Sequence, residues 1–343
     1  MLIRSRFGDY PVREADTLAE VLAATVDSRT WVLADATLAS LHDLGPRVVA
    51  LPSSEATKSW DNLGPLLERL LGEGIRRDGH ILAIGGGVVQ DVAGFVANLL
   101  MRGLRWTFVP STLLAQADSC IGAKTSVNIG RFKNQLGSFY PPREIWLVPA
   151  LLDSLPADAR RSGLGEVAKF HLLESPEAWE WARGRLTWGD RDHLADLVRR
   201  SLAIKQRYIE EDELDRGVRN LLNYGHTFGH AYETATRFAI PHGMAVALGV
   251  CTATALSAER GWVTEAHADE VHDALAPLFT PYERHLRDLD LPALRDGLRA
   301  DKKNIGGATY CILTRGPGRM EKTAVDLDNE LIPAIGRFIA RRA

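Results

Sequence analysis

Short apolar runs that alternate with helical patterns are the feature that most limits what this chain can fold into. The runs are rich in β-branched and aromatic residues, and each ends at a polar residue, a proline or a cluster of glycines. They lie at residues 30–34, 48–51, 81–84, 106–109 and 145–148. Because strands that alternate with helices form βαβ units, the pattern predicts a mostly parallel sheet over about residues 1–155.

The rest of the chain carries long helical patterns and few strand-like runs. The helical patterns cover residues 194–209, 244–260, 267–278 and 329–341. The change falls near Leu155 and Pro156, and no glycine- or serine-rich linker marks it. We therefore expect a Rossmann-like α/β domain at residues 1–155, packed closely on a mainly α-helical domain at residues 156–343.

The composition excludes several classes of protein. A net charge of −3 over 343 residues gives no reason to expect nucleic acid or an anionic membrane as a partner. No run of 18 apolar residues occurs and the first residues do not resemble a signal peptide, so we expect a cytoplasmic protein. Cys120, Cys251 and Cys311 are far apart and lack CxxC spacing, which predicts buried core or pocket residues rather than disulfides.

Three histidines gather in the second half of the chain. If the chain is helical after Gly225, His226 and His230 lie four residues apart on one helix face. His242 follows in a Pro-His-Gly sequence that indicates a turn. Imidazoles bind Zn²⁺, Co²⁺ or Fe²⁺, and a catalytic metal site usually takes three protein ligands, so one of the three histidines can serve another role. The alternative is that all three are ordinary polar residues.

A carboxylate and an ammonium group lie three residues apart at Glu166 and Lys169. Such a pair on a helix is usually a surface salt bridge. The alternative makes Glu166 a metal ligand beside two imidazoles, which is a common catalytic zinc set.

Polar and glycine residues follow the predicted strands. Glycines 85–87 lie between the run at 81–84 and an apolar helical pattern at 92–100. Asp35 and the pair Ser111 and Thr112 also fall at strand ends, where parallel sheets bind ligands. The glycines favour a nucleotide pyrophosphate at a helix N-terminus, although a tight turn alone also needs glycine.

Several basic and amide side chains suit an anionic ligand. Lys124, Lys133 and Asn134 lie in apolar surroundings, and Lys205 and Arg219 precede the histidine segment. The alternative for each is a solvated loop or helix end.

These motifs together resemble 3-dehydroquinate synthase and the wider family of sugar phosphate cyclases. The segments that carry the resemblance are GGGVVQDVAGFVA (85–97), RG (102–103), VPSTLLAQADSCIGAKTSVN (109–128), FKNQLGSFYPP (132–142), SGLGEVAK (162–169), GVR (217–219), LLNYGHTFGHA (221–231), HGMAVALG (242–249) and DKKN (301–304). The resemblance covers nearly the whole chain. Two departures from the family's usual residues are Ala123, where glycine is usual, and Met244, where glutamate is usual.

The resemblance implies NAD and a divalent metal, zinc or cobalt, as cofactors. It assigns the metal to Glu166, His226 and His242. It assigns the NAD site to Asp35, Glu55, Lys58, Gly86, Gly87, Asp91, Ser111, Thr112, Asp118 and Lys133. It assigns substrate binding and catalysis to Lys124, Asn134, Lys169, Lys205, Arg219, Asn223, His230 and one of Lys302 and Lys303. Arg102 is expected to reach the substrate phosphate in the neighbouring subunit of a homodimer.

The implied reaction is a transient oxidation by NAD, elimination of phosphate, re-reduction and an intramolecular aldol cyclisation. The substrate expected first is the seven-carbon acid sugar phosphate DAHP of the shikimate pathway, which gives 3-dehydroquinate. A cyclase of a secondary or polysaccharide pathway, acting on a sugar phosphate such as sedoheptulose 7-phosphate, is the main alternative. A metal-dependent polyol dehydrogenase and a non-catalytic NAD-binding regulator are further alternatives.

Overall fold

A computed structural model describes residues 1–130, 132–287, 289–299 and 309–342. By its internal contacts the chain divides into two units. Unit 1 consists of Met1–Leu155 with Asp190–Val198, and unit 2 of Pro156–Gly189 with Arg199–Ala343. Within the described ranges, none of the helices is both long enough and apolar enough to cross a membrane.

Unit 1 is built on a seven-stranded sheet in the order β1-β2-β9-β6-β5-β3-β4. All neighbouring strands run parallel except β1 and β2. The strands are β1 (Leu2–Ile3), β2 (Tyr10–Glu14), β3 (Thr30–Asp35), β4 (Val48–Leu51), β5 (His80–Gly85), β6 (Arg105–Pro110) and β9 (Glu144–Leu147). The helices that connect them are α1 (Leu18–Thr25), α2 (Ala36–Leu41), α3 (Trp60–Gly72) and α4 (Gly87–Leu99).

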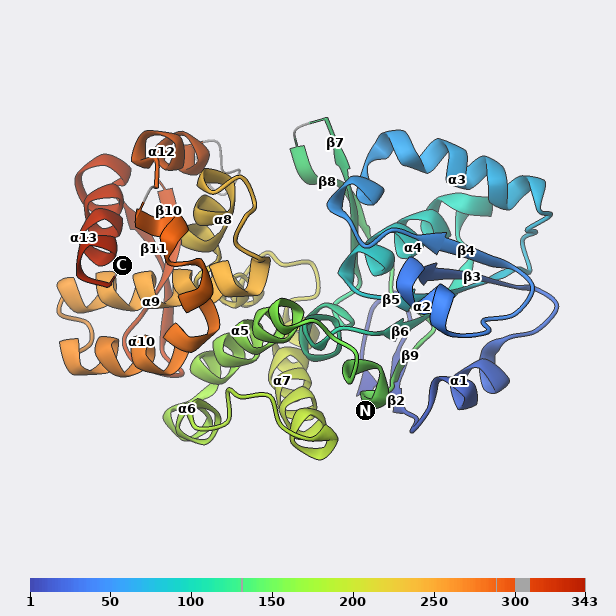
Figure 1. The fold of residues 1–343 in the computed structure, drawn as a ribbon, viewed down its shortest axis with the longest axis horizontal. Coiled ribbons are helices and arrows are strands. Elements are labelled where there is room, and N and C mark those ends of the chain that lie inside the picture. The colour runs from blue at the N-terminus through green and yellow to red at the C-terminus, as the bar shows by residue number, and fades with distance from the viewer. Residues whose placement is uncertain (131, 288, 300–308, 343) are drawn as a thin grey trace. The chain divides into compact units, whose positions relative to one another are not determined.

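Both faces of the sheet are buried. Alternate side chains of β3 and β5, such as Val32 and Leu82, join α1 and α2 in one apolar cluster. On the opposite face α4 packs so closely on β6 that a Cβ on Gly94 would lie 3.0 Å from the Trp106 ring. Figure 1 shows α3 and α4 on one side of the strands and α1 on the other. Burial on two faces explains why these strands are continuously apolar.

The strand order reverses within the sheet, between β3 and β5. From β3 the chain passes to β4 on one side, then returns to β5 and β6 on the other. The carboxyl ends of β3 and β5 therefore flank the point where the strand order reverses, which is where open α/β sheets bind ligands. Asp35 and Gly85 end these two neighbouring strands.

An antiparallel hairpin extends from unit 1. It consists of β7 (Lys124–Ile129) and β8 (Phe132–Phe139), with a register shift near its tip.

Unit 2 is mainly helical. Its helices are α5 (Ala157–Glu174), α6 (Pro176–Arg183), the later part of α7 (Arg191–Glu211), α8 (His226–Ala235), α9 (His242–Glu259), α10 (Glu265–Phe279), α11 (Arg284–Arg287), α12 (Leu291–Arg299) and α13 (Ile332–Arg342). Two antiparallel strands, β10 (Thr309–Thr314) and β11 (Met320–Val325), complete it. Helix α9 is buried on nearly all sides, as expected of a helix that is apolar around its circumference.

Glycines allow α5 and α8 to lie directly against α9. A Cβ on Gly165 of α5 would overlap the carbonyl oxygen of Gly243 in α9. A Cβ on Gly249 would overlap the carbonyl oxygen of Gly225, which precedes α8 and has a φ of +79°. Backbone thus meets backbone at two points along one helix, which no larger residue would permit.

The predicted fold class, a parallel-sheet N-terminal part followed by a mainly helical part, is confirmed. All five predicted strands form. The sequence analysis missed the β7–β8 hairpin and the β10–β11 pair. One strand of each pair, β8 and β11, is mostly exposed and lacks a strong apolar pattern. It was also wrong to place His242 in a turn. Pro241 instead caps the N-terminus of α9, and His242 is its first residue.

We predict that Gly249→Ala lowers the free energy of unfolding by about 1–3 kcal/mol, because the added methyl group forces α8 and α9 apart. Gly64→Ala in α3 is the matched control, because a Cβ there meets no atom within 4 Å. Alanine should leave stability unchanged or raise it by up to about 1 kcal/mol at that position. Urea denaturation measures both changes, and equal midpoints for the two variants would contradict the proposed close packing.

Candidate functional site

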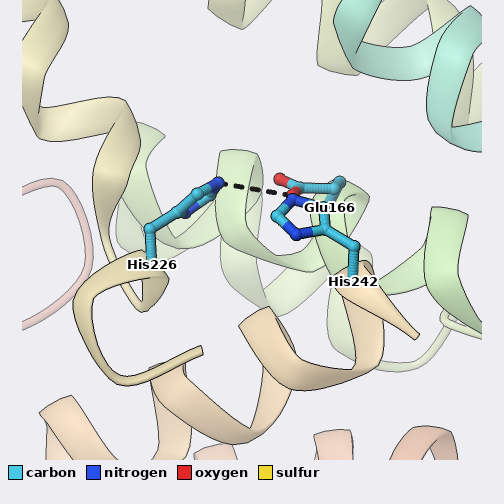
Figure 2. Close-up of side chains that lie close together, drawn as sticks. All are labelled: Glu166, His226 and His242. Atoms are coloured by element: carbon cyan, nitrogen blue, oxygen red, sulfur yellow. Dashed lines mark ion pairs between the residues drawn. The ribbon is translucent and has the colours of Figure 1, made fainter. Parts of the chain in front are cut away.

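Three side chains of unit 2 point toward one another from three different helices. They are Glu166 of α5, His226 of α8 and His242 of α9 (Figure 2). Glu166 Oε1 lies 3.6 Å from His226 Nε2 and 3.3 Å from His242 Nε2. One potential ligand atom of each residue lies close enough to those of the other two for all three to bind a single metal ion.

Local structure places each of these three side chains. Gly165 brings α5 onto α9, so that the next residue, Glu166, faces the first turn of α9. The hydroxyl of Ser162 accepts a hydrogen bond of 2.9 Å from the N–H of Gly243, which gives α9 a cap from a neighbouring helix. The left-handed backbone of Gly225 turns the chain into α8 immediately before His226.

The carboxylate of Glu166 is a buried charge. Its side chain is 1% exposed, and Lys169 Nζ, itself buried, lies 2.5 Å from Oε2. Burial raises the pKa of Glu166, but the Lys169 ammonium and His242 outweigh burial and lower the pKa overall. Glu166 is therefore an ionised carboxylate, and the surface salt bridge that the sequence also allowed is wrong.

The donor set fits a divalent cation. Within the described part of the chain, no group donates a hydrogen bond of regular geometry to either oxygen of Glu166. Both imidazoles turn Nε2 toward this carboxylate, while Nδ1 of His226 faces the carbonyl oxygen of Tyr224 at 3.3 Å. A buried carboxylate with two imidazoles is a catalytic zinc set, and cobalt(II) accepts the same ligands.

Two further residues extend this site along α8. His230 is exposed, and its ring centre lies 5.4 Å from that of His226 and 5.7 Å from that of His242. Glu233 Oε2 lies 3.3 Å from Nδ1 of His242. The sequence analysis missed Glu233, although positions 226, 230 and 233 share one helix face.

Buried basic groups lie on neighbouring segments of unit 2. Arg219 is 3% exposed and donates from Nη1 to the carbonyl oxygen of Glu213 at 2.5 Å, and Lys205 of α7 is 7% exposed. The carboxylate of Asp212 accepts the N–H groups of Gly217 and Arg219 and so shapes this loop. The loop continues into η5 (Val218–Asn223), which carries Asn223 to the start of α8.

The glycine-rich turn of unit 1 opens α4. Gly86 caps the helix without a side-chain hydrogen bond, and a Cβ on Gly87 would meet no atom within 4 Å. A Cβ on Gly86 would lie 3.0 Å from Thr112, so that these two predicted residues are neighbours. The N–H of Ser111 donates to the carbonyl oxygen of Gly85 at 2.9 Å. A glycine-rich turn at a helix N-terminus, without a side-chain cap, fits the pyrophosphate of a dinucleotide.

Asp35 lies at the end of β3, next to β5 in the sheet. One of its oxygens accepts the N–H of Thr37 at 2.9 Å and caps α2.

A second group of predicted NAD-site residues surrounds Lys58, which is 6% exposed. Lys58 forms an ion pair with Asp91 and donates a hydrogen bond of 2.5 Å to Oδ1 of Asn134. Burial raises the pKa of Asp91, although Lys58 acts in the opposite direction. Glu55 accepts a hydrogen bond of 2.8 Å from Asn128 and lies 3.9 Å from Lys133 Nζ.

The remaining predicted residues are more exposed. Lys124 is exposed at the start of β7, and Asp118 is half-buried in η3 (Ala115–Ser119). Arg102 is exposed, with a φ of +65°. Lys302 and Lys303 lie outside the described residues.

Comparison with known proteins identifies the family. A family model for the N-terminal part of 3-dehydroquinate synthase matches residues 48–162, and one for its C-terminal part matches residues 163–304. A 3-dehydroquinate synthase of Methylococcus capsulatus is 38% identical over 87% of this chain and 84% of that protein. One from Paracoccus denitrificans is 37% identical over 90% of this chain and 89% of that protein. The chain belongs to the 3-dehydroquinate synthase family.

Solved structures agree with this assignment. The 2-epi-5-epi-valiolone synthase ValA of Streptomyces hygroscopicus, with NAD⁺ and Zn²⁺ bound, has a TM-score of 0.87 and 25% identity over 99% of each chain. A 2-deoxy-scyllo-inosose synthase has a TM-score of 0.87 at 22% identity, over 98% of this chain and 99% of that chain, which shows a shared fold. Membership of the 3-dehydroquinate synthase family confirms the resemblance seen in the motifs.

We predict that Lys169→Met destabilises the metal-free protein by about 3 kcal/mol or more, because it leaves the buried Glu166 charge without its ammonium partner. Methionine retains most of the apolar stem, so the change tests charge rather than packing. Urea denaturation in the presence of a chelator measures the effect.

Arg183→Met is the matched control. Arg183 forms an i,i+3 pair with Glu180, but their side chains are 39% and 66% exposed, so its loss should cost much less than the loss of Lys169. If Lys169→Met costs no more than this control, Glu166 does not depend on Lys169.

Proposed function

We propose that this protein is a 3-dehydroquinate synthase, an NAD- and metal-dependent cyclase that eliminates phosphate. The observation that carries the proposal is the buried Glu166 carboxylate between two Nε2 atoms, in a chain 35–38% identical to curated 3-dehydroquinate synthases. Glu166, His226 and His242 would hold the divalent cation. When bound, NAD removes and returns a hydride, and the cation makes a coordinated hydroxyl more acidic.

Unit 2 supplies the groups that hold an anionic substrate. Arg219 and Lys205 are buried cations, and burying a cation is costly unless an anion or a set of acceptors compensates. Arg219 also presents a planar guanidinium that suits a carboxylate or phosphate. His230 is exposed, one turn beyond His226, and its imidazole suits proton transfer or phosphate binding.

Unit 1 supplies the groups that hold the nucleotide. The first turn of α4 has no side-chain cap, so backbone N–H groups at Gly86 and Gly87 suit a phosphate, and Asp35 lies at the end of a neighbouring strand. The Lys58 and Asp91 ion pair holds the start of α4 against the β7–β8 hairpin, because Asp91 also accepts the N–H of Ser126 at 2.9 Å. These residues fix the shape of the turn before a ligand arrives.

Sequence identity favours DAHP over other sugar phosphates. Curated 3-dehydroquinate synthases share 35–38% of residues with this chain, whereas the valiolone synthase shares 25%. The motif that carries Arg219 and Asn223 is retained, and a guanidinium suits an acid sugar phosphate. The main alternative remains a cyclase that acts on a neutral sugar phosphate such as sedoheptulose 7-phosphate.

Incubation of the purified protein with NAD⁺, Zn²⁺ or Co²⁺ and DAHP should release phosphate and form 3-dehydroquinate without net NADH. The nucleotide is regenerated within each cycle, so absorbance at the NADH band should not rise. A molybdate assay measures phosphate, and chromatography identifies the carbocycle.

Each alternative has its own signature in this experiment. Turnover of sedoheptulose 7-phosphate but not DAHP would indicate the other cyclase, and net NADH would indicate a dehydrogenase. Substitution of a residue that only hydrogen-bonds to a metal ligand typically lowers metal affinity or activity by roughly 10–100-fold. His226→Ala removes a ligand itself, so it should lower metal affinity and turnover by more than that. Full activity in that variant would reject the assigned metal site.

We further propose a homodimer in which Arg102 acts in the neighbouring subunit. Met101, Arg102 and Gly103 all have positive φ, which turns the exposed Arg102 outward at the end of α4 and η2 (Leu100–Arg102). The cytoplasmic location expected from the sequence stays a prediction.

Mixing two inactive variants tests this arrangement. Subunits with Arg102→Ala and subunits with His226→Ala, unfolded together and refolded, should regain about one quarter of wild-type activity, because half of randomly formed dimers hold one intact site of two. No regain would place Arg102 in its own subunit's site, and a monomeric mass in sedimentation would reject the dimer.

A further inference from the structure

Glu233 is the one carboxylate among the described residues that faces the outer nitrogen of His242. Its Oε2 atom lies 3.3 Å from Nδ1, while Nε2 of the same ring faces Glu166 at 3.3 Å. The Glu233 side chain is only 12% exposed, so water screens this contact poorly. His242 is thus held between two carboxylates, one at each ring nitrogen.

The two imidazoles of the site are anchored in the same way but by different groups. His226 directs Nδ1 to a neutral backbone carbonyl, that of Tyr224, at 3.3 Å. His242 begins α9 after a proline, and among the described residues its Nδ1 faces the carboxylate of Glu233 in place of a carbonyl oxygen. In both rings Nδ1 faces an oxygen atom outside the site, and Nε2 points into the site.

We propose that Glu233 is a positioning residue: its carboxylate accepts the Nδ1–H of His242 and so fixes the ring orientation and tautomer in which Nε2 binds the cation. A neutral imidazole carries one N–H, and the nitrogen without it is the ligand. A carboxylate acceptor selects the Nδ1–H tautomer and increases the electron density at Nε2. The inference rests on the metal site of the proposed function, but it does not depend on which sugar phosphate reacts.

The fold explains why α8 can supply this group. His226, His230 and Glu233 stand at positions i, i+4 and i+7 of one helix, so a ligand and the anchor of a second ligand share one face. Gly229 allows this face to approach α9, because a Cβ there would lie 3.0 Å from the carbonyl oxygen of Ala245. The spacing of α8 and α9 therefore sets the distance between Glu233 and His242.

A second metal ion is the competing explanation. His230, Glu233 and His242 also place one ligand atom each within the span of a single ion. A metal at Nδ1 of His242 together with one at Nε2 would require an imidazolate, which is far more basic than imidazole. A hydrogen bond to Glu233 needs no such deprotonation, and His230 is exposed, which favours one ion and a positioning carboxylate.

Zinc titration of the metal-free protein tests the proposal by calorimetry, without any substrate. Wild-type protein should bind one Zn²⁺ per chain. Glu233→Ala should bind one Zn²⁺ about 10–100-fold more weakly, because the ring loses its anchor. Glu233→Gln keeps an acceptor oxygen without the charge, so its affinity should lie between the two. Glu180→Gln, which alters an exposed glutamate, should bind like wild type.

The outcomes separate this inference from the proposed function. Failure of wild-type protein to bind zinc would reject the metal site itself. One tight ion in wild type with unchanged affinity in both Glu233 variants would reject the positioning role and leave the function intact. Two ions in wild type and one in Glu233→Gln would show that Glu233 is a metal ligand. If Glu233→Ala does not fold, the test rests on Glu233→Gln alone. In that case, zinc affinity and a cobalt(II) visible spectrum that both match wild type would overturn the proposal.

Discussion

The direct contact of three helices through glycine is the constraint on which the metal-like site depends. Gly243 and Gly165 let the backbone of α9 touch α5, and Gly249 with Gly225 lets α9 touch the start of α8. Each contact lies within a few residues of a predicted ligand. The close approach of the backbones shortens the distance that the side chains of Glu166, His226 and His242 span to meet. Close packing in an apolar region therefore determines the geometry of a polar site.

The site concentrates charge where charge is costly. Glu166 is buried with Lys169, and His242 lies between the carboxylates of Glu166 and Glu233. Burial lowers the pKa of His242, but the neighbouring carboxylates of Glu166 and Glu233 outweigh burial and raise the pKa to about 10. Two carboxylates, Glu166 and Glu233, flank His242 here, and Lys169 pairs with only one of them. A bound divalent cation would compensate the remaining negative charge.

Two departures from the family pattern have a structural explanation. Ala123 has a φ of +60° and is buried, in a conformation that glycine adopts freely. Alanine keeps the turn before Lys124 at a cost of about 1–2 kcal/mol. Met244 is fully buried within α9. A thioether suits this apolar position, so its effect on the site is through packing next to His242 rather than through a charge.

The sequence alone determined the parallel sheet, the helical second half and the identity of the metal-site candidates, because each leaves a local pattern of apolar spacing or a motif. It left open whether Glu166 and Lys169 form a surface pair, and it gave no sign that Glu233 faces His242. Both depend on which helices pack together, and residues far apart in the chain decide that. Only the tertiary structure showed that Glu166 is buried, that His242 starts a helix, and that α8 carries both His226 toward Glu166 and Glu233 toward His242. The physical reason is that backbone periodicity is local, whereas burial and the distance between charges are set by packing.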